Sequence, residues 1–457
     1  MPSNFHIQRL PYCEDSAKIF AHIADLSWPV FLDSCSPYSH QGRYDIIAAD
    51  PIATLVTRHQ TTLISRDGHT TESTEDPFNL LKQLLLPEIE AIPGIPFSGG
   101  AIGYFGYDLA RRIERLPELA NDAEHIPELA VGIYTWAVIV DHQDKNTTLV
   151  AQPRATGDWQ TLLKRFAEPR PGYSSEPFKL TTAITGNMDK AAYSRAFTRI
   201  KQFLKEGDCY QVNLTQRFSA SCQGDPWQVY LALRQRNPAP FSAYLNFPGV
   251  QVLSSSPERF LKVEAGKVET KPIKGTLPRK ADAEEDRKQV DKLANSLKDR
   301  AENLMIVDLL RNDLGKSCKN ATVKVPALFE VESYATVHHL VSTITGELAE
   351  DQKALDLLKN CFPGGSITGA PKIRAMAIIE ELEPNRRGVY CGAIGYIGFD
   401  GNMDTNIAIR TLVHSDDSIR FWAGGGIVND SVEASEYQEC FDKAAALFDV
   451  LSKFRPS

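Results

Sequence analysis

The sequence lacks long hydrophobic runs, paired cysteines and any obvious leader, and each absence excludes a class of protein. Apolar runs such as residues 136–140 and 304–307 are far too short to cross a bilayer, and the first twenty residues do not have the pattern of a secretory signal. The eight cysteines are scattered without a C-x-x-C pair, so neither a disulfide framework nor a structural zinc site is expected. We therefore expect reduced thiols and a cytoplasmic location.

Positive charge is also in deficit, because 50 lysines and arginines face 58 aspartates and glutamates, a formal net charge of −8. No global field draws such a chain to nucleic acid or to an anionic membrane, so an anionic substrate needs a local cluster of positive groups. The sequence contains no G-x-C-x-G glutaminase elbow, no Rossmann G-x-G-x-x-G and no phosphate-binding loop. If the protein transfers nitrogen, ammonia must come from solution or from another chain.

A stretch rich in proline, serine, glycine and threonine, residues 168–186, divides the chain. We expect an N-terminal region over residues 1–170 and a catalytic region over 187–457. Beyond the divide, the pattern predicts helices over 189–207, 286–310 and 434–448. Runs of β-formers predict strands over 44–47, 132–140, 342–348, 410–414 and 419–423.

One segment is echoed far along the chain: residues 99–108 read GGAIGYFGYD and residues 391–400 read CGAIGYIGFD, with seven of ten positions identical. Glycines among β-formers fit strands that another backbone approaches closely. Chance similarity of two glycine-rich strands is the simpler interpretation. We favour two structurally related halves of a large α/β (α+β) fold, a two-layered sandwich of mostly antiparallel sheets flanked by helices.

Two of the expected helices bear candidate metal ligands. Glu302 lies in the apolar segment 299–313 with Asp308 and Asp313, and Glu436, Glu439 and Lys443 share one helical face. Two carboxylates from separate helices, with positions left open for substrate oxygens, suit Mg²⁺. A solvated acidic face is the commoner role of such glutamates.

Several segments have the composition of an anion site. Residues 362–372 (FPGGSITGAPK) combine glycines and hydroxyls with a helix start, and residues 423–427 (AGGGI) would let backbone donors approach a carboxylate. Tight turns, however, are the usual role of glycine runs. Arg410 could clamp a carboxylate or form a surface ion pair, and a histidine such as His339 is more often structural than catalytic.

Two residues suit covalent and acid–base chemistry. Lys274 lies between Ile273 and a glycine, where an apolar setting lowers the pKa of an amine and makes it nucleophilic. Glu258, in the segment SPERF, is a candidate general acid if burial raises its pKa. An exposed loop lysine is the simpler reading of Lys274 from the residues alone.

Seven segments taken together resemble the chorismate-utilising enzymes: SPERF, PIKGT, DRAENLMIVDLLRND, FPGGSITGAPK, IRT, AGGGIV and EYQECFDK. That family includes the large subunits of anthranilate synthase and aminodeoxychorismate synthase and the isochorismate and salicylate synthases. The resemblance implies an anthranilate synthase component I-like fold, chorismate as substrate, Mg²⁺ as cofactor and a separate glutamine amidotransferase that supplies ammonia.

Lys274 distinguishes among the members. Anthranilate synthases usually have alanine there, so ammonia attacks ring carbon C2 directly. The resemblance to aminodeoxychorismate synthases implies that Lys274 attacks C2 while Glu258 protonates the departing C4 hydroxyl, and that ammonia then attacks C4. Members that activate water are expected to have a lysine base where this chain has Gln211, which argues against an isochorismate synthase.

The same resemblance implies further site residues. Glu302 and Glu439 match the Mg²⁺ ligands. The positions that match contacts to the substrate's carboxylates and ring are Gly275, Thr276, His339, Ser366, Tyr390, Arg410, Gly426 and Lys443.

In this family the N-terminal half has a tryptophan pocket, and the matching residues here are Ser34, Arg43, Tyr44, Pro240, Phe241 and Ser242. Gln41 and Gly42 replace the aromatic residue and serine usual before the arginine, which leaves occupancy by tryptophan open.

Three functions remain in competition. The first is the chorismate-binding subunit of an aminodeoxychorismate synthase, acting in the synthesis of 4-aminobenzoate and folate. An anthranilate synthase large subunit is disfavoured by Lys274. A non-catalytic regulator that binds tryptophan or chorismate predicts the loss of a charged site residue, whereas Glu258, Lys274, Glu302, His339, Arg410, Glu439 and Lys443 are all present.

Overall fold

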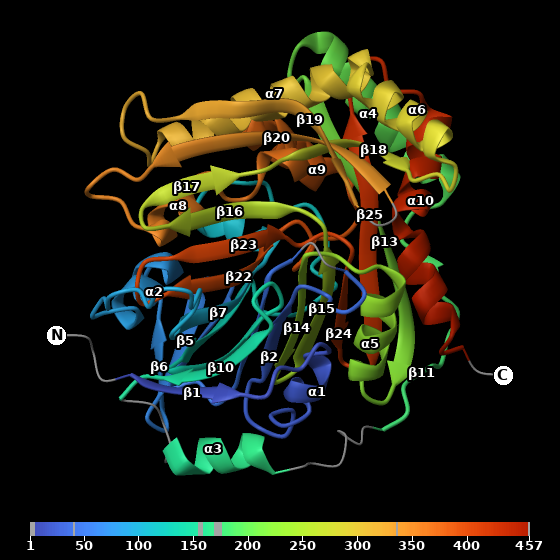
Figure 1. Ribbon diagram of the computed structural model, residues 1–457. Coiled ribbons are helices and arrows are strands. Elements are labelled where there is room, and N and C mark those ends of the chain that lie inside the picture. The colour runs from blue at the N-terminus through green and yellow to red at the C-terminus, as the bar shows by residue number, and fades with distance from the viewer. Residues whose placement is uncertain (1–4, 40–41, 154–158, 169–175, 335–336, 456–457) are drawn as a thin grey trace.

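Two large β-sheets form the body of the protein, and helices cover their outer faces and one end (Figure 1). The computed structural model describes residues 5–39, 42–153, 159–168, 176–334 and 337–455. Every pair of neighbouring strands within the two sheets is antiparallel, as the register of each described pair shows. The predicted sandwich of mostly antiparallel sheets is therefore confirmed.

The first sheet has 13 strands in the order β1-β10-β9-β3-β2-β14-β15-β24-β25-β13-β11, with β12 and β21 paired to β13. Its strands are β1 (His6–Leu10), β2 (Val30–Asp33), β3 (Tyr44–Ala48), β9 (Trp136–Asp141), β10 (Asn146–Ala151), β11 (Lys179–Leu180), β12 (Thr185–Gly186), β13 (Gln211–Gln223), β14 (Phe241–Phe247), β15 (Val250–Ser256), β21 (Gly369–Ala370), β24 (Thr411–Ser415) and β25 (Ser418–Ile427).

The second sheet has 12 strands in the order β18-β20-β17-β16-β23-β22-β7-β8-β4-β5-β6, with β19 paired to β20. Its strands are β4 (Ala53–Arg58), β5 (Thr61–Arg66), β6 (His69–Ser73), β7 (Gly100–Phe105), β8 (Leu129–Tyr134), β16 (Arg259–Glu264), β17 (Lys267–Thr270), β18 (Ile273–Pro278), β19 (Lys324–Ser333), β20 (Val337–Glu347), β22 (Ala393–Gly398) and β23 (Met403–Ile407).

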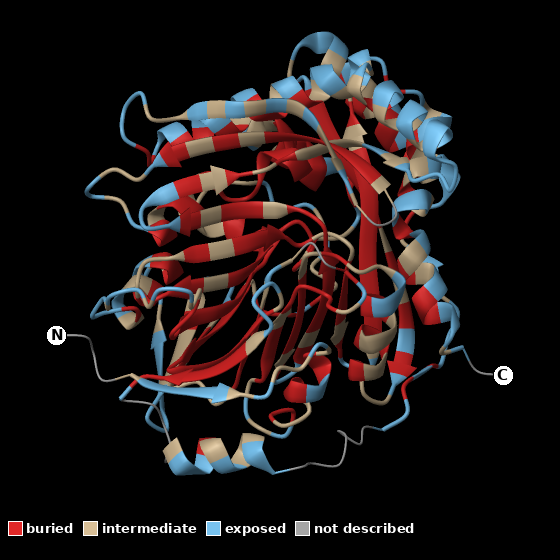
Figure 2. Cartoon of the chain, in the orientation of Figure 1, coloured by how far each residue is buried: buried red, intermediate tan, exposed pale blue. Residues whose placement is uncertain are grey.

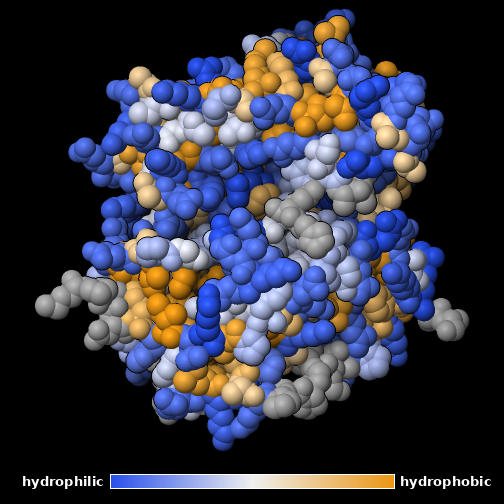
Figure 3. All heavy atoms as spheres, in the orientation of Figure 1, coloured by the Kyte–Doolittle hydropathy of each residue, from blue (hydrophilic) through white to orange (hydrophobic). Residues whose placement is uncertain are grey.

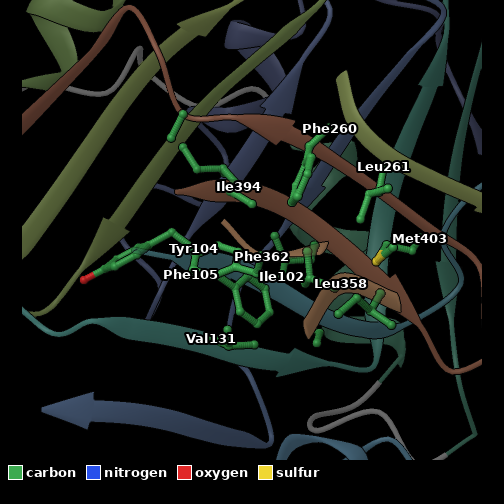
Figure 4. Close-up of a cluster of buried hydrophobic side chains, with 14 of the residues drawn as sticks. Ile102, Tyr104, Phe105, Val131, Phe260, Leu261, Leu358, Phe362, Ile394 and Met403 are labelled. Carbon is green, nitrogen blue, oxygen red and sulfur yellow. The ribbon is translucent and has the colours of Figure 1, made fainter. Parts of the chain in front are cut away.

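A continuous hydrophobic core fills the space between the sheets. Leu245 and Val252 of the first sheet share one cluster with Ile102 and Phe260 of the second. Figure 4 shows part of this cluster, in which Leu358 and Phe362 join the strand residues. The strands in the middle of the sheets are red along most of their length in Figure 2, because both faces of many of them are covered. A strand covered on both faces needs a nearly unbroken apolar run, which the sequence of β9, WAVIVD, provides.

Ten α-helices and two short 3₁₀ helices lie in the described residues. They are α1 (Ala17–Phe20), α2 (Pro77–Leu84), α3 (Trp159–Ala167), α4 (Lys190–Glu206), α5 (Trp227–Arg236), α6 (Ala283–Ala294), α7 (Leu297–Gly315), α8 (Ala354–Cys361), α9 (Lys372–Leu382), α10 (Glu433–Ser452), η1 (Tyr107–Arg112) and η2 (Gly365–Ile367). Helices α1, α3, α5 and α10 contribute to a second core on the outer face of the first sheet.

The prediction of a helix over 189–207 was right at both ends, since α4 spans Lys190–Glu206. Asp189 caps its N-terminus by accepting a hydrogen bond from the Ala192 N–H, and Gly207 ends it in the left-handed conformation at φ +82°. The prediction of one helix over 286–310 was wrong, because α6 ends at Ala294 and α7 begins at Leu297. The break lies at Ser296, whose side chain accepts a hydrogen bond from the Asp299 N–H and so caps a new helix.

One strand prediction and one turn interpretation also needed correction. The run 132–140 is not one strand: it includes parts of β8 and β9, which belong to different sheets. Residues 423–427 form no turn, since all five lie within β25 and pair with β13. The remaining predicted strands coincide with β3, β20, β24 and β25 to within a few residues.

The echoed segments are neighbours in space. Strands β7 and β22 lie side by side in the second sheet as an antiparallel pair, with Gly103 directly opposite Gly395. A Cβ atom on Gly103 would lie 2.1 Å from the Ala130 carbonyl oxygen, and one on Gly395 would lie 2.1 Å from the Asp404 carbonyl oxygen. The close backbone of β8 thus requires a glycine at position 103, and that of β23 requires one at position 395, which explains why both copies have it.

We expect Gly103→Ala to lower the free energy of unfolding by about 3 kcal/mol, because the new methyl group would press on the backbone of β8. Urea unfolding followed by circular dichroism measures the change. Gly315→Ala is the matched control, since a Cβ there meets open space at the end of α7 and should be neutral or slightly stabilising. Equal stability of the two variants would contradict the packing argument.

The two predicted regions, 1–170 and 187–457, stay a prediction, and both contribute strands to each sheet. Within the predicted divide at 168–186, residues 169–175 lie outside the described residues. All eight cysteines are free thiols. In the described part of the chain no helix is both long and apolar enough to cross a membrane. Hydrophilic residues cover most of the face shown in Figure 3, with hydrophobic patches between them.

Candidate active site

The charged residues singled out in the second half of the sequence converge where the two sheets meet helices α7 and α10. Glu302, Lys443, Glu258 and Glu439 all act electrostatically on the Lys274 ammonium. Helix α10 packs along β25 of the first sheet, and α7 packs against β18 and β20 of the second. The site is therefore assembled from both layers of the sandwich.

Glu258 follows β15 and is only 6% exposed. Burial raises the pKa of its carboxyl group, an effect that the nearby Lys274 ammonium partly offsets. The Ser366 hydroxyl donates a hydrogen bond of 3.0 Å to Oε1 of Glu258. A carboxyl group with a raised pKa is more often protonated near neutral pH, as a general acid must be.

Lys274 lies on β18 and is half-buried. Burial lowers the pKa of its amine, and the Glu302 carboxylate opposes that shift. Its Nζ donates to the Ser366 carbonyl oxygen at 3.4 Å, so one residue contacts both the candidate acid and the candidate nucleophile. The two pKa shifts favour a neutral amine beside a protonated carboxyl group.

Three glutamates form the acidic side of the site. A Cβ atom on Gly425 of β25 would lie 3.2 Å from Oε1 of Glu439 and 3.3 Å from Oε2 of Glu436, so both carboxylates lie over this glycine. Lys298 connects Glu436 to Glu302, its Nζ lying 3.8 Å from Oε1 of each.

Their surroundings shift the pKa values of the two predicted metal ligands, Glu302 and Glu439, in opposite directions. Burial raises the pKa of Glu302, with Lys274 and Lys298 opposing the shift. Burial also acts upward on the pKa of Glu439, but the Lys443 ammonium, 2.6 Å from its Oε1, outweighs it and holds that pKa below its usual value.

This donor set fits a hard cation that uses few protein ligands. In the described residues no group of three or more histidine, cysteine, aspartate or glutamate side chains has the geometry to enclose a metal ion. Mg²⁺ does not need such a cage, because it is commonly held by one or two carboxylates and completes its octahedron with water and substrate oxygens. Glu302 and Glu439, from separate helices, fit that pattern.

Two acidic residues that the sequence grouped with Glu302 lie elsewhere. The Asp308 side chain is 75% exposed, and Asp313 is buried in ion pairs with Lys316 and Lys372. Lys298 is a site residue that the sequence reasoning did not name, and Glu436 was placed on the face of Glu439 but was not among the expected metal ligands. The i, i+3 spacing from Glu439 indicated Glu436, whereas nothing in the sequence around Lys298 places it between two glutamates on different helices.

His339 and Thr276 face each other across β18 and β20, and Oγ1 of Thr276 lies 2.8 Å from Nδ1 of His339. Burial, reinforced by Arg410, lowers the pKa of His339 to about 4, so its ring is neutral at pH 7. Gly275, between Lys274 and Thr276 in the chain, has φ +73°, and a Cβ there would lie 2.8 Å from Cδ1 of Leu293. Glycine is thus required at this bend beside Lys274.

Positive groups and backbone complete the site. Arg410 precedes β24, and its guanidinium donates a hydrogen bond of 3.3 Å to Oδ1 of Asn237. The guanidinium also interacts electrostatically with the Glu258 carboxylate. Lys443 donates to the Gly424 carbonyl oxygen at 3.0 Å. Gly426 lies against Gln211, since a Cβ there would be 2.6 Å from Nε2 of that residue.

Tyr390, another of the expected substrate contacts, belongs to a buried aromatic pair. Tyr390 is buried and stacks on Trp422 of β25, with ring centroids 5.9 Å apart. Together the residues of the candidate site offer a candidate general acid, a candidate amine nucleophile, a carboxylate pair that fits a cation, and several positive or neutral donors that fit an anion.

A separate cavity of about 730 Å³ is lined by five of the six residues predicted for the tryptophan pocket, which are Arg43, Tyr44, Pro240, Phe241 and Ser242. The sixth, Ser34, lies against Gly42, which itself lines the cavity. A Cβ atom on Gly42 would be 2.3 Å from the Cβ atom of Ser34. The Arg43 guanidinium forms ion pairs with Asp141 at 2.7 Å and Asp144 at 2.8 Å. Gln41 lies outside the described residues.

The chain matches characterised proteins over nearly its whole length. The model of the family described as chorismate binding enzyme matches residues 32–449. Aminodeoxychorismate synthase component 1 of Salmonella typhimurium is 49% identical over 438 residues, which are 95% of this chain and 95% of that protein. Its Escherichia coli counterpart is also 49% identical, over 96% of this chain and 97% of that protein.

More distant relatives have related names. Anthranilate synthase component 1 of Acetivibrio thermocellus is 36% identical over 96% of this chain and 93% of its own length. The crystal structure of anthranilate synthase component I from Streptococcus pneumoniae superposes with a TM-score of 0.79 at 31% identity, covering 89% of this chain and 92% of that one.

Proposed function

Because this chain belongs to the chorismate binding enzyme family, we propose that it converts chorismate and ammonia to 4-amino-4-deoxychorismate, the activity named in its aminodeoxychorismate synthase relatives. The observation that carries the proposal is the half-buried Lys274 amine, joined through Ser366 to the buried carboxyl group of Glu258. An amine nucleophile and a general acid at one site are the groups that a two-step displacement requires.

In the first step the neutral Nζ of Lys274 attacks ring carbon C2 of chorismate, and both conjugated double bonds of the ring shift by one bond as the C4 hydroxyl leaves. Glu258 donates the proton with which that hydroxyl departs as water. In the second step ammonia attacks C4, both double bonds shift back, and the C2–Nζ bond breaks to release Lys274 as the neutral amine. The new C4 ammonium then returns a proton to the Glu258 carboxylate. The covalent relay thereby puts the amino group on C4, the carbon that lost the hydroxyl.

We assign Mg²⁺ to Glu302 and Glu439, with Glu436 beside them. When bound there, the cation would neutralise and orient the carboxylate on the substrate ring. The residues around it provide the remaining charge compensation that a dianionic substrate needs. Arg410 and Lys443 supply positive charge, while Gly275, Thr276, Ser366 and Gly426 supply hydrogen-bonding groups, and Tyr390 and the neutral His339 border the ring.

We further propose that ammonia comes from glutamine through a partner amidotransferase in a heterodimer. The relatives are named as component 1 of their synthases, and this sequence contains no glutaminase elbow of its own. Such an enzyme would act in the cytoplasm, in the synthesis of 4-aminobenzoate and folate.

The 730 Å³ cavity is the proposed site for a tryptophan ligand. Its size and its apolar wall at Pro240 and Phe241 suit an aromatic amino acid, whereas the commitment of Arg43 to two aspartates argues against a free guanidinium for the ligand's carboxylate. Dialysis of the protein against labelled tryptophan distinguishes an occupied pocket from an empty one.

Anthranilate synthesis is the second candidate, since relatives at 36% identity have that name. Incubation of the purified chain with chorismate, MgCl₂ and an ammonium salt at alkaline pH, followed by mass spectrometry, separates the two activities. We expect a product in which an amino group has replaced the hydroxyl and the enolpyruvyl group is retained. Fluorescent anthranilate with free pyruvate would refute the assignment, and a folded protein without turnover would favour a binding protein.

A further inference from the structure

Lys298 lies in the first turn of α7, and its Nζ is 3.8 Å from Oε1 of Glu302 and 3.8 Å from Oε1 of Glu436. The two glutamates belong to different helices, so a single ammonium group bridges α7 and α10 at the proposed metal site. Its side chain is 56% exposed, which leaves it a route into solvent.

The local position of Lys298 is otherwise unfavourable. The N-terminal turn of a helix has a partial positive charge and disfavours cations. Ser296 already caps this end of α7 through the Asp299 N–H, so the lysine has no capping role. The nearby charges that favour an ammonium here are those of Glu302, Glu436, Glu439 and Asp299.

The three glutamates of the site repel one another unless a cation lies among them. Lys443 is already engaged, at 2.6 Å from Glu439 and 3.0 Å from the Gly424 carbonyl oxygen. The Lys274 ammonium also acts on Glu302, but in the described part of the chain Lys298 is the group whose ion pairs join Glu302 to Glu436.

We propose that Lys298 is a tethered counter-cation, held between Glu302 and Glu436, that competes with Mg²⁺ for Glu302 and so weakens the affinity of the site for the metal ion. This inference rests on the proposed function, because it takes Glu302 as a Mg²⁺ ligand. A divalent cation at Glu302 would repel the ammonium, and the long flexible stem of lysine lets it swing into solvent.

The test is a calorimetric titration of MgCl₂ into the metal-free full-length chain. Lys298→Met removes the charge and keeps the length of the side chain, and we expect the Mg²⁺ dissociation constant to fall about tenfold. Lys298→Arg keeps the charge and should bind Mg²⁺ within about twofold of the parent. Lys190→Met is the matched control, an exposed lysine in the first turn of α4, and should leave the constant unchanged.

Circular dichroism verifies that each variant is folded. Weaker Mg²⁺ binding by Lys298→Met would overturn the proposal, because it would mean that the lysine positions Glu302 for the metal ion. Unchanged binding would overturn it as well, and in both cases the parent still binds Mg²⁺ and still forms product from chorismate. A parent chain that binds no Mg²⁺ would overturn the metal site and this inference together.

Discussion

Lys274→Ala is expected to lower the rate of 4-amino-4-deoxychorismate formation by about 10³-fold or more, because the variant has no amine to form the covalent bond to C2. Residual turnover should shift toward anthranilate, since ammonia can then attack C2 directly. Mass spectrometry of the products, with chorismate, MgCl₂ and an ammonium salt, measures both the rate and the partition.

The matched control for this substitution is Lys267→Ala, an exposed lysine on strand β17 of the same sheet. It should leave rate and product unchanged. Rapid quenching of the parent enzyme should also yield a fraction of chain that bears a chorismate-derived adduct on Lys274, absent from the alanine variant. An unchanged rate and product in Lys274→Ala would remove the covalent role.

The sequence predicts local features of this fold well where a few neighbouring residues decide them. Asp189 and Gly207 bound α4 because a cap and a left-handed terminus are local signals. The break between α6 and α7 was missed, since charged residues and leucines continue through it and only the Ser296 cap separates the two helices. Apolar runs such as 132–140 do not reveal at which residue a chain leaves one sheet for the other.

The candidate site likewise has features that the sequence predicts and features that only the folded chain shows. Motif resemblance identified Glu258, Lys274, Glu302 and Glu439, and the structure places their charges within reach of one another. Residue type could not show that Ser366 contacts both Glu258 and Lys274, because those contacts join segments about a hundred residues apart in the chain. The burial that shifts both pKa values is likewise a property of the two packed layers, which no single segment contains.

Glu258→Gln is expected to reduce kcat for 4-amino-4-deoxychorismate formation by about 10²- to 10⁴-fold, the usual contribution of a general acid. The amide keeps the shape of the side chain and can accept the Ser366 hydrogen bond, but it has no acidic proton for the departing hydroxyl. Binding of chorismate should change little, so KM separates this loss from misfolding. Glu264→Gln, an exposed glutamate on β16, is the control and should retain the parent rate.

The pH profile gives the sharper test, because activity requires one group protonated and the other deprotonated. Activity needs Glu258 protonated, so it declines as pH rises through a pKa that burial has raised. It also needs Lys274 neutral, so it increases as pH rises through a pKa that burial has lowered. The parent profile should therefore be bell-shaped when the concentration of free ammonia, rather than of total ammonium, is held constant. In Glu258→Gln the decline toward high pH should vanish from the residual activity while the rise due to Lys274 remains; a decline that persisted would mean that another group donates the proton.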